Sequence, residues 1–195
     1  MLYFTTSIAV VAGLCLAISV LYLFVGVRRP SHRTLNILFS LFALFYAGAI
    51  MTARSSYLAN DFDQFVTANR FSVVFSAAGF AAFLWFVAAY TRVRPKVFLW
   101  AITAALGFYG LSGIFAPDLV VNTTQGVETL TFPWGEAVLM LQTAEPGLLP
   151  LLILSMIAMI GYVVVADVQQ FRRGERDAAV ALAIGIGWFA FTIIE

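Results

Sequence analysis

Most of the positive charge in this chain lies in three short clusters, each directly after a long apolar segment. Nine of the eleven Lys and Arg residues belong to these clusters: Arg28, Arg29, Arg33, Arg92, Arg94, Lys96, Arg172, Arg173 and Arg176. Cytoplasmic loops of membrane proteins are enriched in Lys and Arg. Because the clusters follow the first, third and fifth apolar segments, the pattern predicts a multi-pass membrane protein whose N-terminus lies outside.

The apolar segments have the length that a membrane-spanning helix needs, about 20 residues. Composition agrees, because 62% of the residues are hydrophobic and only 11% are charged. The expected spans are Leu2–Val27, Thr34–Ala53, Phe71–Thr91, Val97–Pro117, Gly147–Ala166 and Ala178–Ile194. No basic residue precedes the first span, which is therefore interpreted as a retained helix and not as a secretory signal. We expect an all-α polytopic membrane bundle of six spans that forms one domain over residues 1–195.

Acidic residues divide unequally between the two expected faces of the membrane. The inner loops add only Asp167, Glu175 and Asp177 to their nine basic residues, whereas the outer loops hold Arg54 and Arg70 with six acidic residues. A basic inner face matches an anionic cytoplasmic leaflet and gives no reason to expect a nucleic-acid partner. The expected location is the inner (cytoplasmic) membrane.

Six crossings would return the C-terminus to the outer side, directly after the apolar segment that precedes Glu195. We therefore expect a longer protein, in which a seventh helix leads to a cytoplasmic output domain. A complete protein of six helices is the alternative.

The longest outer connection, Asp118–Glu145, contains neither Lys nor Arg. Between Val120 and Phe132 it holds two short β-rich runs around Gly126, and apolar and polar residues alternate there with the period of a strand. Pro133–Gly135 ends this stretch. A loop of this length inside a compact domain is usually functional or disordered, and its β-branched content favours order. We expect a small hairpin lid between the fourth and fifth helices.

Small residues recur at helical spacing in three of the spans. They are Ser72, Ser76 and Gly79 in the third, Gly107, Gly110 and Gly113 in the fourth, and Gly185 and Gly187 in the sixth. Helices in lipid associate through close packing over such residues. The third helix, which is also rich in aromatic residues, is expected at the centre of the bundle.

Residues that could carry catalysis or bind a metal are scarce. His32 is the only histidine, so this chain offers no bis-histidine haem ligation. Cys15 is the only cysteine, and the only lysine, Lys96, lies at the expected inner surface. None of the spans carries an ionisable residue at its middle, which disfavours a proton or ion pump. We expect a non-catalytic chain without metal or cofactor.

A ligand site is predicted at the outer half of the bundle. Its candidate residues are Arg54, Tyr57, Asn69, Arg70, Trp85 and Trp134. A guanidinium can bind a carboxylate through two hydrogen bonds, and aromatic walls suit an apolar tail. The hypothesis is therefore a small amphiphilic, anionic ligand. A simpler interpretation pairs both arginines with Asp61, Asp63 or Glu136 and treats the aromatic residues as packing and interfacial residues.

Four segments carry a resemblance to a known family. They are RRPSHRTLNILFSLFALFYAGAIM, NRFSVVFSAAGFAAFLWFVAAYT, the outer PWG at 133–135, and QQFRRGERDAAVALAIGIGWF. The order of these features resembles the N-terminal seven-helix membrane region of bacterial sensor histidine kinases, which also precedes some diguanylate cyclases. The resemblance implies a final helix that leads to PAS, kinase or cyclase domains. This chain stops before that helix and contains no kinase residues.

The function expected from these features is that of a membrane-embedded sensory input domain, which passes an outer or intramembrane signal to a cytoplasmic output domain. Its expected partners are the lipid bilayer, a small amphiphilic ligand and an output domain in the same polypeptide, with a homodimer left open. A small polytopic transporter or channel is the alternative, and a scaffold that anchors a partner enzyme is a third class.

Overall fold

The computed structural model describes residues 3–59, 61–120, 127–135, 137–141 and 147–184. Its long helices are α1 (Tyr3–Arg28), α2 (Arg33–Tyr57), α3 (Phe62–Thr91), α4 (Lys96–Phe115) and α5 (Leu149–Arg172). Residues 176–184 are helical as well. Two 3₁₀ turns, η1 (Pro30–His32) and η2 (Pro117–Leu119), and two strands, β1 (Val127–Thr131) and β2 (Ala137–Leu141), complete the described elements.

The expected all-α bundle is confirmed, and five of its described helices are long and apolar enough to cross a membrane. They correspond to the first five predicted spans. The predicted sixth span begins with the helical residues 176–184, and its remainder, including Gly185 and Gly187, lies outside the described residues.

Helix α3 begins well before the apolar run from which its span was predicted. The run starts at Phe71, but the helix starts at Phe62, where the Asp61 carboxylate accepts a 2.8 Å hydrogen bond from the backbone N–H of Gln64. An acidic N-cap satisfies one of the free N–H groups at a helix start and favours the helix dipole. The helix therefore extends through a polar first turn that hydropathy alone does not detect.

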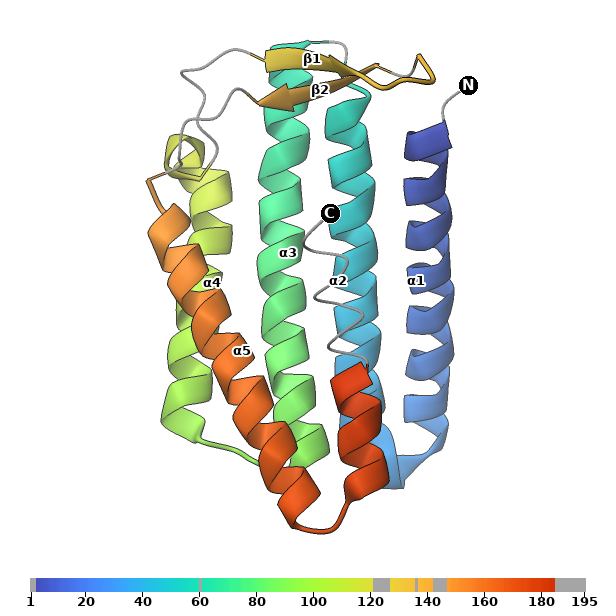
Figure 1. Cartoon of the computed structure of the whole chain (residues 1–195), viewed down its shortest axis with the longest axis vertical. Helices are drawn as coiled ribbons and strands as arrows, with labels where there is room; N and C mark the ends of the chain where they lie inside the picture. The colour runs from blue at the N-terminus through green and yellow to red at the C-terminus, as the bar shows by residue number, and fades with distance from the viewer. Residues whose placement is uncertain (1–2, 60, 121–126, 136, 142–146, 185–195) are drawn as a thin grey trace.

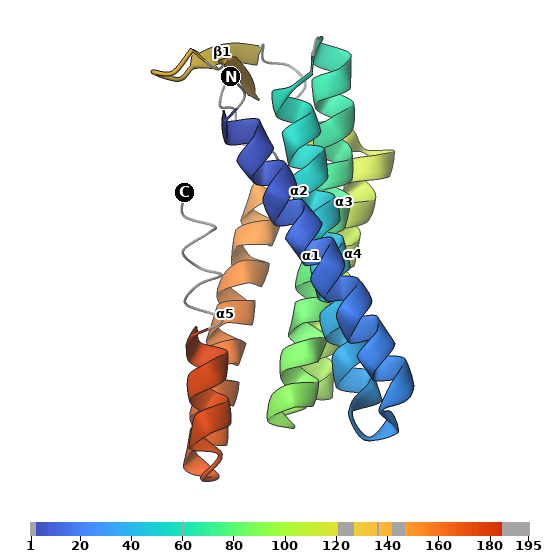
Figure 2. The ribbon, with the colours of Figure 1, turned by 90° about the vertical axis from the view of Figure 1, so that its right-hand side faces the viewer.

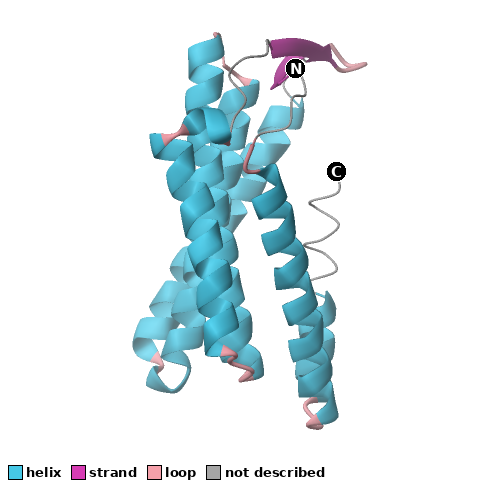
Figure 3. Ribbon diagram, turned by 90° about the vertical axis from the view of Figure 1, so that its left-hand side faces the viewer, coloured by secondary structure: helices cyan, strands magenta, loops and turns pink. Residues whose placement is uncertain are grey.

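The first four helices stand side by side in chain order (Figure 1). Neighbours in this row run antiparallel, because each connection joins adjacent ends. Helix α5 crosses one face of the row, where it contacts α3 and α4. Figures 2 and 3 show α5 and the helix at 176–184 standing together on one side of that row.

The up-and-down topology brings all three basic clusters to one end of the bundle (Figure 1). We call this the basic end; it contains η1, the α3–α4 connection at Arg92–Pro95, and the turn after α5. The opposite end, which we call the hairpin end, holds the start of α1, the α2–α3 connection and the strands. The structure thus confirms that the clusters share one side.

Helix α3 occupies the centre of the packing, as expected. It contacts α2, α4 and α5, and it has more fully buried residues than any other described helix. The main core cluster draws its buried members from α3, α4, α5 and the helix at 176–184: Phe83, Leu84, Val87, Ala88, Leu99, Met159, Tyr162, Val163, Ala166 and Leu182. This cluster lies towards the basic end, where α5 approaches α3.

Two of the three predicted glycines of α4 allow a close approach to α3. A Cβ on Gly110 would lie 3.0 Å from the Ala77 Cβ, and a Cβ on Gly113 would lie 3.2 Å from a Val73 methyl group. A Cβ on Gly107 would contact nothing within 4 Å. The closest approach occurs elsewhere, at Gly48 of α2, where a Cβ would lie 2.8 Å from the Phe75 ring of α3.

Helix α1 packs chiefly against α2. Ser19 and Ser40 each donate a side-chain hydrogen bond to the backbone carbonyl of the other, at 2.9 and 2.8 Å. Nearer the hairpin end, the Arg54 Nε donates a 2.9 Å hydrogen bond to the carbonyl of Thr5. Polar bonds therefore join α1 to α2 at two levels along the helices.

The expected hairpin is present between α4 and α5, and the second of its two predicted β-rich runs contains β1. The strand that pairs with β1 follows it in the chain, whereas the prediction placed that strand before Gly126. Strand β1 pairs with β2 in antiparallel register, with Thr129 opposite Leu139, so the turn between these two strands includes Phe132–Gly135. Gly126 lies outside the described residues. The Gly135 N–H donates a 2.8 Å hydrogen bond to the Phe132 carbonyl, and Gly135 has φ +84°. Proline early in the turn and glycine at its left-handed position favour this arrangement.

Candidate functional site

Four of the six predicted ligand residues lie close to the hairpin end of two neighbouring helices. Arg54 and Tyr57 belong to the last turn of α2, and Asn69 and Arg70 lie in the hairpin-end part of α3. Since α2 and α3 are antiparallel neighbours, the fold brings these residues to one region. Arg54 already uses its Nε in the bond to the Thr5 carbonyl, which gives that side chain a structural role.

Arg70 differs from Arg54 in its hydrogen bonding. Its Nε is buried, and the structure gives this nitrogen no hydrogen-bond partner. A buried donor without an acceptor carries a desolvation penalty that a carboxylate or carbonyl oxygen would remove. Arg70 is therefore the member of the predicted site that most needs a partner.

The simpler pairing of the arginines with nearby acids is not what the described residues show. They contain no ion pair between Arg54 or Arg70 and either Asp61 or Asp63, and the Asp61 carboxylate caps α3. Glu136 lies outside the described residues.

Of the two predicted tryptophans, Trp85 lies far from Arg70. Trp85 is fifteen positions further along α3, which places it about 22 Å away along the helix axis. There its Nε1 donates a 3.0 Å hydrogen bond to the Thr103 hydroxyl, and its ring contacts Trp100 edge-on. Trp134 stacks on Phe132 in the hairpin turn and is 50% exposed. Trp85 thus belongs to the α3–α4 interface.

A set of hydrogen bonds at the basic end joins the helices that form the core cluster. The Tyr162 hydroxyl of α5 donates a 2.6 Å bond to the Val93 carbonyl, and the Arg173 Nη1 donates a 3.1 Å bond to the Thr91 carbonyl. The Tyr90 hydroxyl donates a 3.2 Å bond to the Ala178 carbonyl in the next helix. We call these three bonds the polar junction. It connects the end of α3 with both arms of the turn after α5.

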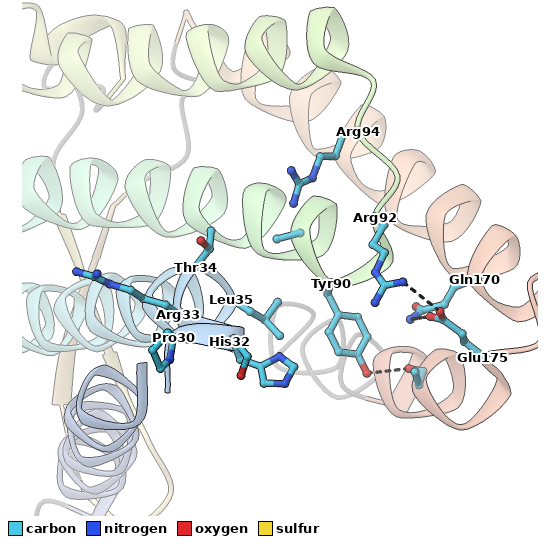
Figure 4. Close-up of a pocket in the computed structure, with 13 residues that line it drawn as sticks. Pro30, His32, Arg33, Thr34, Leu35, Tyr90, Arg92, Arg94, Gln170 and Glu175 are labelled. Atoms are coloured by element: carbon cyan, nitrogen blue, oxygen red, sulfur yellow. Dashed lines mark hydrogen bonds and ion pairs between the residues drawn. The ribbon is translucent and has the colours of Figure 1, made fainter. Parts of the chain in front are cut away.

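Beside the polar junction lies a cavity of about 450 Å³, which we call the basic cavity (Figure 4). Residues from η1 and the start of α2, from the end of α3, and from the turn after α5 line it. Its charged lining residues are Arg33, Arg92, Arg94 and Glu175, and His32 and Tyr90 also line it. Arginines outnumber acidic groups, so the cavity can attract an anion.

Gln170 is the most buried polar residue of this cavity, at 2% exposure. Its Nε2 donates a 3.2 Å hydrogen bond to the Glu175 Oε2, while its Oε1 is buried without a partner. On the other side of Glu175, Arg92 Nη1 lies 3.9 Å from Oε1, and the side chains of this pair are 78% and 44% exposed. An ion pair this long and exposed is weak.

The basic cavity was not predicted as a site from the sequence. Its arginines were recognised there, but only as markers of topology, since hydropathy and charge do not reveal which loops adjoin in space. A sequence signal did exist: three basic clusters on one side of an antiparallel bundle must converge at its end.

Within the described part of the chain, no group of three or more His, Cys, Asp or Glu side chains could hold a metal ion. The fold and composition define an all-α bundle of long apolar helices with a small β-hairpin at one end. No family model, curated protein or solved structure matches this chain.

Proposed function

We propose that this chain is a membrane-embedded sensory domain that detects a small anionic amphiphile at its hairpin end and signals at its basic end. The exposed surface of its long helices is rich in large apolar side chains, such as Val20, Leu154 and Ile157, which suits contact with lipid. The basic end faces the cytoplasm in this proposal, following the usual distribution of Lys and Arg.

One observation carries the proposal: a single helix, α3, links an unsatisfied donor to the polar junction. Arg70, with its unpartnered Nε, lies towards the start of α3, and Thr91, which accepts the bond from Arg173, is its last residue. The two positions are about 32 Å apart along the helix. A ligand that binds Arg70 would act on the element that also holds the junction.

Signalling requires only that the ligand prefers one of two helix arrangements. A carboxylate bound to Arg70 would favour the arrangement in which its oxygens reach the guanidinium. A small rotation or translation of α3 then strains the three long-range bonds of the polar junction. Tyr90, Thr91 and Val93, which each form one of these bonds, move with the end of α3. Small helix shifts of this kind are a common switching device.

Hydrogen exchange on the chain reconstituted in phosphatidylcholine nanodiscs tests this proposal. Dodecanoate serves as the probe, since it combines a carboxylate with an apolar tail. We expect dodecanoate to alter amide exchange across residues 172–184 in the wild type, and Arg70→Gln to abolish that response. Arg29→Gln, which removes one charge at the other end, should retain it.

Unchanged exchange in the wild type at saturating dodecanoate, or an identical response in Arg70→Gln, would refute the proposal. If the chain transports dodecanoate across a proteoliposome membrane and amide exchange at residues 172–184 does not change, the alternative function, a small transporter, is favoured.

A further inference from the structure

We propose that the basic cavity binds a phosphate ester that also carries a hydroxyl group, such as the headgroup of a phosphatidylglycerol-type lipid. This site lies at the opposite end of the bundle from Arg70 and does not depend on the sensory role. Its volume, about 450 Å³, is within the range of small-ligand sites. It would hold a headgroup or a small soluble phosphate ester.

The position of Arg92 is the first observation that supports this proposal. Arg92 has φ +58° and is the only described residue other than glycine with a positive φ. It forms the C-cap of α3, a position at which glycine avoids the steric cost that an L side chain incurs. The chain thus has an arginine at a backbone position that favours glycine, and Figure 4 shows its guanidinium directed towards Gln170 and Glu175.

The partner that Arg92 has in the structure leaves its guanidinium available to a ligand. The 3.9 Å pair with Glu175 is exposed, and Glu175 also accepts a hydrogen bond from Gln170. Arg94, from the same connection, and Arg33, from the start of α2, line the cavity too. Several arginines around one cavity suit the oxygens of a phosphate, which accept paired hydrogen bonds from guanidinium groups.

Gln170 provides the second, independent observation. Its unpartnered Oε1 is an acceptor buried beneath the cavity surface, so a ligand hydroxyl reaches it once the Gln170 side chain turns towards the cavity. A phosphate diester offers only acceptors at neutral pH, so it cannot satisfy this oxygen. A hydroxyl on the same ligand can donate to it. The cavity therefore combines donors for a phosphate with an acceptor for a hydroxyl.

The location favours a lipid as the source of that ligand within the proposed membrane setting. The basic cavity lies at the ends of the long helices. Helix α1, which leads into η1 at the same end of the bundle, exposes apolar residues such as Phe24 and Val27. Basic pockets between helix ends at the cytoplasmic surface are typical sites for anionic headgroups.

Native mass spectrometry of the purified chain, supplied with single lipids in detergent, tests the proposal. Phosphatidylglycerol is compared with neutral phosphatidylcholine and with phosphatidylmethanol, a phosphodiester of the same charge that lacks a headgroup hydroxyl. We expect phosphatidylglycerol to bind about tenfold more tightly than phosphatidylcholine, the factor typical of one charged hydrogen bond. It should also bind more tightly than phosphatidylmethanol.

Two double variants separate the cavity from general surface charge. Arg92→Gly with Arg94→Gln removes two cavity arginines, and the glycine suits the left-handed backbone, so folding is protected. Arg29→Gln with Arg172→Gln removes two arginines of the same end that do not line the cavity. The first pair should lose at least about tenfold in phosphatidylglycerol affinity, and the control pair should stay close to the wild type.

Glycerol 3-phosphate, added as a competitor, distinguishes the two sources of the ligand. Failure to displace the lipid assigns the site to a headgroup anchored by its tails, and displacement extends the site to soluble phosphate esters. Equal affinity for phosphatidylglycerol and phosphatidylcholine, or equal losses in both double variants, would overturn the proposal. Equal affinity for phosphatidylmethanol would overturn the role of Gln170. None of these results depends on the response to dodecanoate.

Discussion

The hydroxyl of Tyr162 in α5 donates a 2.6 Å hydrogen bond to the backbone carbonyl of Val93, in the connection between α3 and α4. The two residues are 69 positions apart in the chain. Tyr162 is buried and belongs to the core cluster, with its ring also against Phe98. One side chain thus fixes α5 to the point at which the chain turns from α3 into α4.

Tyr162→Phe should lower the free energy of unfolding by about 1 kcal/mol, because it removes this bond and leaves the Val93 carbonyl without its partner. Unfolding in mixed micelles at increasing dodecyl sulfate fraction measures the change. Tyr22→Phe is the matched control, since the Tyr22 ring contacts Phe39 but its hydroxyl forms no hydrogen bond within the described residues. An equal loss in both variants would show that the Tyr162 hydroxyl contributes nothing specific.

Gly48→Ala should be destabilising, by about 1–3 kcal/mol, the usual cost of overpacking. The new methyl group would lie 2.8 Å from the Phe75 ring, so α2 and α3 would have to separate or the ring would have to move. Gly107→Ala serves as the comparison, because its methyl group would meet nothing within 4 Å. In detergent, the melting temperature of Gly48→Ala should therefore be well below that of Gly107→Ala. The reverse order would contradict the described α2–α3 packing.

At position 92, glycine should give a more stable protein than alanine, by about 1 kcal/mol, because alanine retains the left-handed strain and glycine does not. Both variants lack the guanidinium, so the comparison isolates the backbone contribution. The free energy of unfolding of Arg92→Gly and Arg92→Ala, measured under identical conditions, checks this. Equal stability would mean that the backbone relaxes away from φ +58° once the arginine is removed.

The orientation can be tested by cysteine labelling in intact cells on a Cys15→Ala background. Thr129 on β1 and Ser31 in η1 are both exposed and lie at opposite ends of the bundle. An impermeant thiol reagent should label Thr129→Cys in intact cells and Ser31→Cys only after the membrane is permeabilised. Labelling of Ser31→Cys alone in intact cells would reverse the proposed orientation.

The helices could be predicted from the sequence because long uncharged segments have few alternatives at this composition. Their ends could not, since a helix continues into polar residues when a cap is present, as at Asp61 and Gln64. The hairpin turn was misplaced for a different reason. Pro133–Gly135 was interpreted as the end of the β-rich stretch, although proline followed by glycine is also a turn signal; the partner strand, Ala137–Leu141, was not recognised.

The candidate site was predicted only in part, because sequence proximity to an outer loop does not fix depth. Arg54, Tyr57, Asn69 and Arg70 flank the α2–α3 connection and therefore fall together. Trp85 was included because of its residue type, but it lies about four helical turns further along α3 than Arg70. The unpartnered atoms of Arg70 and Gln170 depend on tertiary packing, so no sequence pattern could reveal them.

The way in which α1 is attached makes the stability of this protein uneven. Among the described residues, no buried member of the core cluster comes from α1, whose polar bonds to α2 include the Ser19–Ser40 bonds and the Arg54–Thr5 bond. Local opening requires only the free energy of the contacts that are lost. Helix α1 contacts the rest of the bundle chiefly through α2. Release of α1 would therefore break that one extensive interface and leave the packing of α3, α4 and α5 in place.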